Sequence, residues 1–269
     1  MQNKLPRFVS RLAPISLLVL AACAGTPQQS QFLTSYEGLT AREDMVRAGA
    51  LDRSDRAALA QIRSVAIAPT VYAPSPSARD WMTDQERDLV LREVDAQLCF
   101  ELSERYAIAA PGQQPDAAQV RAAVTEVTPT GRVGSAAAAA ASFFIPGPLG
   151  LRAPGTLGGL AAEAEMLDPS GRQIGAIVWR RNATAIGTDN PSLSRVGDAL
   201  QFAEPFGDAA AAAMSPEDYT PRDLSGGQDP CAAYGPRFRP EGFLSRFATG
   251  LYIPETSAAR QAEPAPTQP

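Results

Sequence analysis

Residues 160–179 constrain the fold most, because they read as two strands joined by a tight turn. The turn is Asp168-Pro169-Ser170-Gly171, with proline at its second position and glycine at its fourth. This pattern is typical of a type I turn followed by a glycine bulge. Such a turn pairs Asp168 with Arg172 and thereby sets the register of both strands. The segment therefore predicts an antiparallel hairpin with a defined pair of faces.

The register assigns every residue of the hairpin to a face. One face is expected to hold Leu160, Ala162, Ala164, Met166, Ile174, Ala176 and Val178, and the other Ala161, Glu163, Glu165, Leu167, Gln173, Gly175, Ile177 and Trp179. The first face is expected to be the packed one. Ala164→Asp should then cost several kcal/mol, because it buries a charge, whereas Glu165→Ala should cost at most about 0.5 kcal/mol.

Other segments carry the spacing of helices and strands. Thr83 and Glu86 form a capping-box pattern that predicts a helix to about Tyr106. Strands are expected over 64–72, 107–110 and 119–127, and a last helix over 192–214, kinked or restarted at Pro205. Short helices are expected over 40–49 and 54–62. Together these elements predict an α/β (α+β) fold of two layers, a mixed or antiparallel sheet of about four strands covered by two helices.

The amino terminus predicts export and lipid attachment. A positive stretch and a short apolar run precede Leu20-Ala21-Ala22-Cys23, which resembles the lipobox of bacterial lipoproteins. That resemblance implies cleavage before Cys23 and a diacylglycerol on its sulfur. The residue after the cysteine is Ala24 and not aspartate, and by resemblance to Gram-negative lipoproteins with such a residue this implies sorting to the outer membrane. The alternative is an ordinary secretory signal in which Cys23 is incidental. The expected organisation is a signal peptide (1–22), a lipidated tether (23–31), an α/β domain (32–214), an extension (215–254) and a disordered tail (255–269).

Composition removes several classes of function. The chain has no histidine, which excludes Ser-His-Asp catalysis and histidine-ligated metals. Its formal net charge is −5 and its only lysine is Lys4, so no basic face for nucleic acid is expected. No Cys-x-x-Cys and no glycine-rich phosphate loop occur. We therefore expect no cofactor, no metal and no enzymatic activity.

Glu163 and Glu165 are the acidic pair that an enzyme reading would use, because glycoside chemistry needs two carboxylates. The competing interpretation places both on a solvated or arginine-paired sheet face, with Arg121, Arg180 and Arg181 as available partners. The second interpretation is favoured, since both glutamates lie two residues apart on one strand.

Two further features are candidate sites. Residues 134–160 are rich in alanine and glycine and contain Phe143, Phe144 and Ile145, which either contact an apolar groove or membrane, or pack on the sheet from a flexible connection. Cys99 and Cys231 form an even pair once Cys23 carries lipid, and an oxidising compartment favours a disulfide between them. The alternative is a buried Cys99 and a free thiol at Cys231.

Five pieces of the chain occur in a characteristic order. They are Phe32-Leu33-Thr34-Ser35-Tyr36, Val65-Ala66-Ile67-Ala68-Pro69-Thr70-Val71, Glu104-Arg105-Tyr106, Arg121-Ala122-Ala123-Val124-Thr125-Glu126, and Gly159-Leu160-Ala161-Ala162-Glu163-Ala164-Glu165-Met166-Leu167-Asp168 with Gly171. As an ordered set, covering about residues 31–215, they resemble a family of bacterial putative lipoproteins known as domain of unknown function 3313. Ala68 stands where family members commonly have aspartate. The resemblance implies export and lipidation but brings no known activity or catalytic residues.

The sequence therefore favours a lipid-anchored envelope lipoprotein, a non-enzymatic accessory or binding module on the periplasmic face of the outer membrane, with the inner membrane as the alternative site. Its expected partners are the membrane, through the lipid, and an envelope protein or apolar ligand. The competing functions are a carboxylate-based hydrolase and a purely structural envelope tether.

Overall fold

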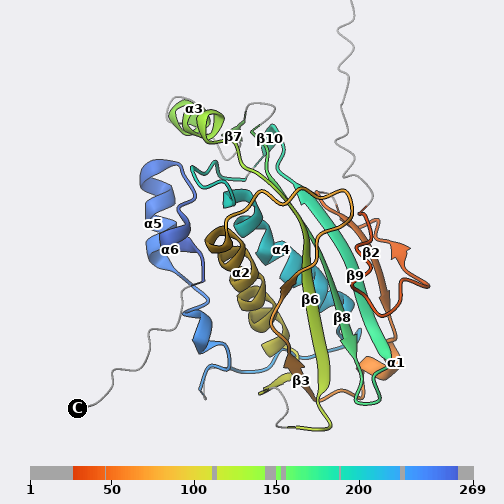
Figure 1. Ribbon diagram of the computed structural model, residues 1–269. Coiled ribbons are helices and arrows are strands. Elements are labelled where there is room, and N and C mark those ends of the chain that lie inside the picture. The colour runs from red at the N-terminus through yellow and green to blue at the C-terminus, as the bar shows by residue number, and fades with distance from the viewer. Residues whose placement is uncertain are drawn as a thin grey trace, which may run out of the picture.

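The computed structural model describes residues 27–45, 47–110, 114–142, 150–152, 156–187, 189–224 and 228–259. In this part of the chain an open mixed sheet is packed against helices (Figure 1). The strands are β1 (Thr40–Ala41), β2 (Gly49–Ser54), β3 (Ser64–Ile67), β4 (Val71–Tyr72), β5 (Ala107–Ala109), β6 (Ala118–Thr128), β7 (Gly150–Leu151), β8 (Gly159–Leu167), β9 (Gln173–Asn182) and β10 (Ile186–Gly187). The helices are α1 (Arg56–Leu59), α2 (Asp84–Ser103), α3 (Arg132–Ser142), α4 (Gly197–Ala213), α5 (Pro240–Thr249) and α6 (Pro254–Ser257), with a 3₁₀ turn at Ala232–Tyr234.

The main sheet has eight strands within the described residues, in the order β1-β2-β9-β8-β6-β3-β5, and β4 also pairs with β6. β3 runs parallel to β5 and β6, and β4 runs parallel to β6, whereas the other pairs are antiparallel. The α/β class and the mixed sheet are confirmed. The expected number of about four strands is wrong, because β1 and β2 widen one edge and short parallel strands widen the other.

Residues 40–54 account for much of this difference. The sequence predicts a short helix over 40–49, since Thr40 and Glu43 have the spacing of a capping box. Instead, Thr40 begins β1, and β2 pairs with β9 along six residues from Gly49 to Ser54. A helix cap contributes about 1 kcal/mol, whereas pairing with β9 satisfies backbone groups along a whole strand. The long-range pairing therefore overrides the local pattern.

Helices α2 and α4 cover one face of the sheet and enclose the main core (Figure 1). α2 begins with the expected capping box, in which Thr83 and Glu86 bond reciprocally. α4 continues through Pro205 and does not restart there. Its buried residues on both sides of the proline, including Leu200 and Phe206, hold the two halves on the same core.

The hairpin keeps its predicted turn but not its predicted register. The amide of Asp168 donates to the Arg172 carbonyl at 2.9 Å, and Gly171 has a φ of 83°. Leu167 then pairs with Gln173 as expected, but Met166 pairs with Gly175, so a β-bulge inserts one residue. From the bulge onward the face assignment of β9 is reversed.

The bulge places the larger side chains of β9 under the helices. Ile177 and Trp179 belong to the core beneath α2 and α4, and the Trp179 ring lies 5.6 Å from that of Phe206. Ala176 and Val178 instead share the opposite face with the two glutamates of β8. Burying tryptophan rather than alanine on the enclosed face contributes far more apolar area.

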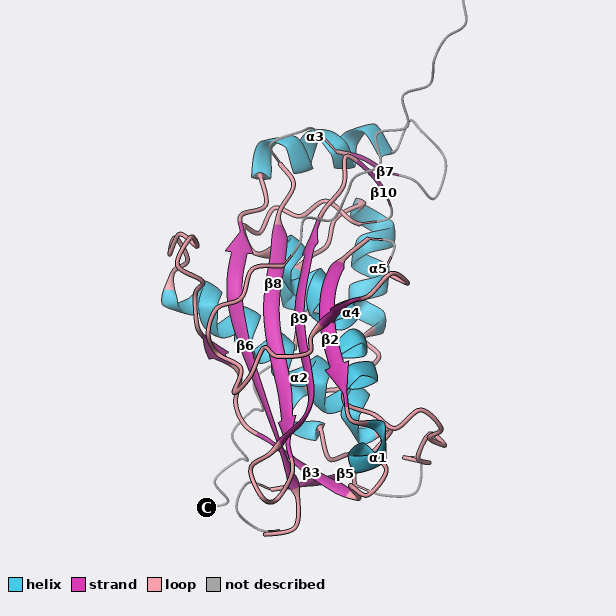
Figure 2. Ribbon diagram, turned by 90° about the vertical axis from the view of Figure 1, so that its right-hand side faces the viewer, coloured by secondary structure: helices cyan, strands magenta, loops and turns pink. Residues whose placement is uncertain are grey.

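The second face of the sheet is also covered, contrary to the prediction of one covered face. Residues 30–39 cross it, and Leu33 is buried against Ala176 and Val178. Figure 2 looks onto this face, with the strands in front of α2 and α4 and loops crossing them. The end of the expected tether is therefore part of the folded domain.

The alanine-rich segment forms α3 and then β7, which pairs with β10, instead of one flexible connection. Phe143, Phe144 and Ile145 lie outside the described residues. After β7, the guanidinium of Arg152 donates to both carboxylate oxygens of Asp198 at 2.6 and 2.8 Å. Both side chains are nearly fully buried, so this ion pair fixes the segment to the first turn of α4. Among the described helices, none combines the length and apolar character needed to cross a bilayer.

Candidate functional site

The first candidate site is the pair of carboxylates on β8. Glu163 and Glu165 are both 0% exposed, so the expectation of a solvated face is wrong. Residues 30–36, which we call the N-terminal strap, lie over them. The strap approaches from 127 to 133 residues away in sequence, which is why strand alternation alone could not place it.

Glu163 accepts three hydrogen bonds from the N-terminal strap. The amide and hydroxyl of Ser30 donate to its two oxygens at 2.7 and 2.9 Å, and the Tyr36 hydroxyl donates at 2.6 Å. Burial, followed by the hydrogen bond to Glu163, raises the pKa of Tyr36 above its ordinary value of 10.0. Tyr36 therefore serves as a donor to this carboxylate at neutral pH.

Glu165 is held in the same way, one pair of residues further along β8. The amide and hydroxyl of Thr34 donate at 2.8 and 3.0 Å, and the Gln173 side-chain amide donates at 2.7 Å. The guanidinium of Arg121 lies 3.5 Å from the Glu165 carboxylate, so one of the three expected arginine partners is present. Arg180 pairs with Glu126 and Arg181 with Asp189 instead.

The two carboxylates hold the N-terminal strap on the sheet, and in this arrangement they are not accessible to a substrate as a general acid and a general base. Each carboxylate oxygen is occupied by a donor, and the N-terminal strap covers both side chains. General acid-base work requires the carboxyl group to reach the proton that it transfers. The site is therefore best described as an attachment point for the N-terminal strap.

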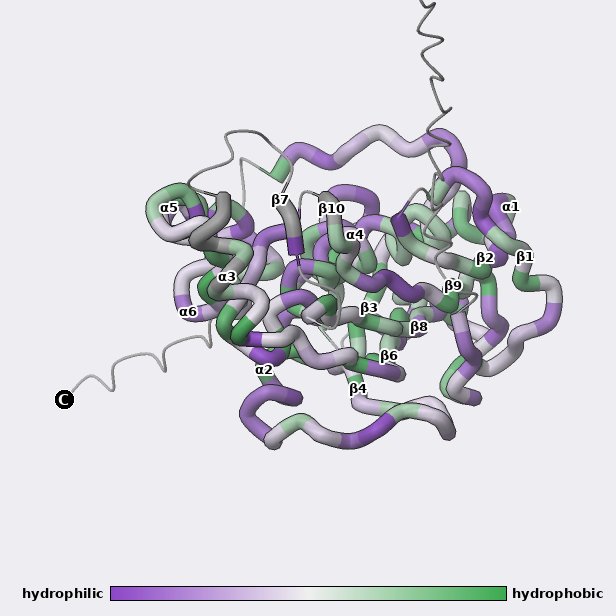
Figure 3. The backbone as a smooth tube through the Cα atoms, turned by 90° about the horizontal axis from the view of Figure 1, so that it is seen from above, coloured by the Kyte–Doolittle hydropathy of each residue, from purple (hydrophilic) through white to green (hydrophobic). Residues whose placement is uncertain are grey.

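The second candidate site is formed by residues 215–259, which we call the C-terminal extension. Figure 3, seen from above, shows α5 and α6 on the side of α2 and α4 that faces away from the sheet. A disulfide joins Cys99 of α2 to Cys231, with 5.8 Å between the Cα atoms, which is the pairing expected from the sequence. The bond anchors the extension on α2.

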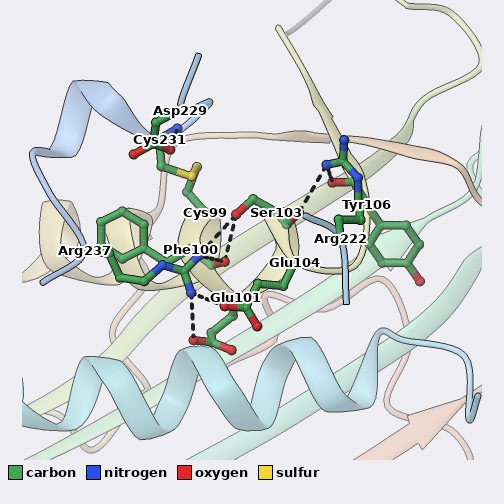
Figure 4. The surroundings of a disulfide bond; sticks show 10 residues. All are labelled: Cys99, Phe100, Glu101, Ser103, Glu104, Tyr106, Arg222, Asp229, Cys231 and Arg237. Atoms are coloured by element: carbon green, nitrogen blue, oxygen red, sulfur yellow. Dashed lines mark hydrogen bonds and ion pairs between the residues drawn. A yellow bond between two sulfur atoms is a disulfide. The ribbon is translucent and has the colours of Figure 1, made fainter. Parts of the chain in front are cut away.

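Arginines of the extension bind the carboxyl end of α2 beside the disulfide (Figure 4). Arg237 contacts the Glu104 carboxylate and the Phe100 carbonyl, and its guanidinium lies 5.1 Å from the Phe100 ring. Arg222 donates to the Ser103 and Tyr106 carbonyls at 3.1 and 2.7 Å. Two guanidinium groups thus satisfy carbonyls that the end of α2 leaves free.

A buried pair continues these contacts along α2. Arg239 lies 3.8 Å from Glu93, and their side chains are 7% and 4% exposed. Glu93 also accepts from Gln97 and from the Ala259 amide. Burial raises the pKa of Glu93 despite these contacts. The sequence placed the disordered tail from residue 255, but α6 runs to Ser257, and Ala258 and Ala259 are buried.

A groove separates α4 from the C-terminal extension, with a volume of about 630 Å³. Its walls carry charged and aromatic side chains rather than a catalytic constellation. Within the described residues, no cluster of three or more cysteine and acidic side chains could hold a metal ion. The lining includes Glu93, Gln97 and Glu101 of α2, Glu204 and Asp208 of α4, and Phe238, Phe243 and Arg246 of the extension.

The sequence alone does not reveal this groove, because α2 supplies one part of its lining and α4 with the extension supplies most of the rest from a distant part of the chain. One signal was available, namely the alternation Arg237-Phe238-Arg239 in a region otherwise rich in proline and glycine. Such alternation favours binding of the arginines to a common acidic surface. The acidic surface itself is visible only after α2 and α4 are packed together.

Comparison with known proteins gives one family. A family model described as protein of unknown function (DUF3313) matches residues 28–210. A search of curated proteins found no match. Two solved structures of the PelC dodecamer from Paraburkholderia phytofirmans, the second a point variant, align at 10% identity with TM-scores of 0.38 and 0.37. They cover 64% and 63% of this chain and 99% of each PelC chain, and at these scores they support no conclusion about it.

Proposed function

The chain belongs to the DUF3313 family of proteins of unknown function, and from that premise we propose that it is a lipid-anchored envelope lipoprotein. In this proposal the chain is exported, cut before Cys23 and lipidated there. Its α/β domain then faces the periplasm, at the outer membrane. The domain acts there as a non-enzymatic accessory module that binds a partner.

The attachment of the N-terminal strap carries this proposal. Ser30 lies seven residues after Cys23 and is fixed to the buried Glu163. Seven residues span at most about 25 Å when extended. A lipid on Cys23 would therefore hold the domain within that distance of the bilayer, rather than on a long free tether.

The same contacts weigh against the hydrolase alternative. Glu163 and Glu165 are the carboxylates closest together in sequence on the sheet, and both are buried and hydrogen-bonded to the N-terminal strap. A substrate could reach them only after the strap had left the sheet. The proposal of a binding module needs no such rearrangement.

Labelling with radioactive palmitate tests the anchor. We expect label on the wild-type chain and none on Cys23→Ser, with mass spectrometry finding a diacylated Cys23 at the new amino terminus. Cys231→Ser serves as the control, since it removes a different cysteine and should leave the label unchanged. Equal label on the wild type and Cys23→Ser would refute the lipoprotein proposal.

Separation of inner and outer membranes by density then tests the location. We expect the wild-type chain with the outer membrane and Cys23→Ser in neither membrane fraction. Recovery of the wild type with the inner membrane would contradict the outer-membrane part of the proposal while leaving lipidation intact.

A further inference from the structure

Two carboxylates in the groove have no partner in the described part of the chain. Glu204 and Asp208 lie one helical turn apart on α4, both are exposed, and both line the groove. Neither forms a hydrogen bond or an ion pair with a described residue, whereas Glu93 and Glu101 on α2 pair with arginines. The α4 wall thus keeps unneutralised negative charge beside a surface that already binds cations.

The contacts of the C-terminal extension show that the carboxylates of α2 bind arginine side chains. Arg237 contacts Glu101 and Glu104, and Arg239 contacts Glu93, so two arginines two residues apart in sequence both engage α2. Phe238, between them, is 74% exposed and lines the groove. An arginine-aromatic-arginine segment therefore already lies along one wall.

The wall formed by the C-terminal extension, opposite α4, also presents apolar surface to the groove. Phe243 of α5 is 54% exposed and lines the groove together with Phe238. The guanidinium of Arg246 lies 5.9 Å from the Phe243 ring. A volume of about 630 Å³ is within the roughly 300–1,000 Å³ range of ligand-binding pockets. Carboxylates on one wall and aromatic rings on the other complement a ligand that is cationic and partly apolar.

We propose that this groove binds an extended peptide segment of a protein partner in which arginine or lysine alternates with aromatic or large aliphatic residues. The cations contact Glu204 and Asp208, and the apolar side chains contact Phe238 and Phe243. This inference rests on the proposed function as a binding module, and it names the chemistry of the partner.

Isothermal titration with a synthetic peptide tests the site. The probe is acetyl-Gly-Arg-Phe-Arg-Phe-Gly-amide, titrated into the chain starting at residue 23 with Cys23→Ser and the disulfide intact. We expect saturable one-to-one binding with a Kd below about 1 mM. A probe with glutamate in place of both arginines should not bind.

Matched double variants separate the groove from general attraction to an acidic protein. Glu204→Gln with Asp208→Asn should weaken binding at least tenfold, and Phe243→Ser should weaken it severalfold. Asp88→Asn with Asp116→Asn makes the same charge change at exposed positions outside the groove, and its Kd should stay within twofold of the wild type. The four acidic side chains are exposed, so circular dichroism and urea midpoints should match the wild type.

Absence of saturable binding would overturn the proposal, as would equal weakening by the two double variants. Because the tested chain carries no lipid, these results are independent of the palmitate experiment. A failure to bind the peptide would not affect the proposal that Cys23 is lipidated, and absence of palmitate on Cys23 would not affect the proposal that the groove binds a peptide.

Discussion

The N-terminal strap and the C-terminal extension both cover the central layers of the domain, but different physics holds each in place. The strap lies on the sheet and donates five hydrogen bonds to two fully buried carboxylates. The extension lies on the helices and combines one disulfide with arginine contacts, of which the Arg237–Glu104 pair is partly exposed and the Arg239–Glu93 pair is buried. The family match begins before the strap and ends before the extension.

This difference indicates that the N-terminal strap is an integral part of the sheet, whereas the C-terminal extension is a segment attached to the helices. Removing the strap would take away all three donors described for Glu163 and two of those described for Glu165, which would keep Gln173. Because these hydrogen bonds go to charged groups, strap and sheet should unfold together. The extension keeps a covalent bond even when its other contacts open. We therefore expect the extension, and not the strap, to open as a separate unit.

The largest expected effect is the loss of a buried carboxylate. Glu165→Ala removes the acceptor for Thr34 and Gln173, and hydrogen bonds to charged groups are worth about 1.5 to 3 kcal/mol each. We expect the free energy of unfolding in urea to fall by about 4 to 5 kcal/mol. Glu126→Ala, on the neighbouring strand β6, is the control and should cost about 1 kcal/mol or less, because its pair with Arg180 is partly exposed. Equal costs would show that the strap is an attached segment after all.

The next effect is the loss of the disulfide. Cys99→Ala with Cys231→Ala opens a loop of 132 residues and should weaken docking of the extension by about 2 to 4 kcal/mol. Hydrogen exchange should show faster exchange in residues 228–259, while the amides of Ser30 and Thr34 keep their protection. If strap and extension lose protection together, the two regions form one cooperative unit and the comparison fails.

Substitution of two arginines compares the buried and the partly exposed contacts that hold the extension on α2. Arg239→Met leaves Glu93 buried without its cation and should weaken docking by about 3 kcal/mol. Arg237→Met removes a pair whose side chains are 38% and 36% exposed, which should cost about 1 kcal/mol or less. Hydrogen exchange at Tyr252 measures both. The reverse ranking would mean that exposed contacts, rather than the buried pair, hold the extension.

The smallest effect is a pH dependence of the extension. Burial raises the pKa of Glu93 above its ordinary 4.5, so the docked state binds the proton more tightly than the open state. Docking should therefore weaken as pH rises from about 4.5 through the raised pKa, the opposite of a salt-bridged carboxylate with a lowered pKa. The difference between wild type and Glu93→Gln, followed by exchange at Ala259 over this range, isolates the effect. A wild type that docks more tightly with rising pH, relative to Glu93→Gln, would contradict the burial argument.

Local patterns predicted the elements whose causes are local. The capping box at Thr83 placed α2, and the turn at Gly171 placed the hairpin. The bulge in β9 escaped prediction because distant contacts accompany it: the Asp55 amide donates to the Ile174 carbonyl at 2.8 Å, and a Cβ on Gly175 would lie 3.0 Å from the Ala213 carbonyl oxygen. The burial of Glu163 and Glu165 likewise requires the N-terminal strap, which no alternation in β8 can reveal.

The sequence distance between the strap and its carboxylates also affects the order in which the domain can form. Ser30 is synthesised 133 residues before Glu163, which at roughly 5 to 20 residues per second is a delay of about 7 to 27 seconds. The strap therefore waits for β8 before it can close over the sheet. Until then Ser30 and Thr34 lack their acceptors on β8, which leaves time for the proposed processing of Cys23 before the strap becomes part of the fold.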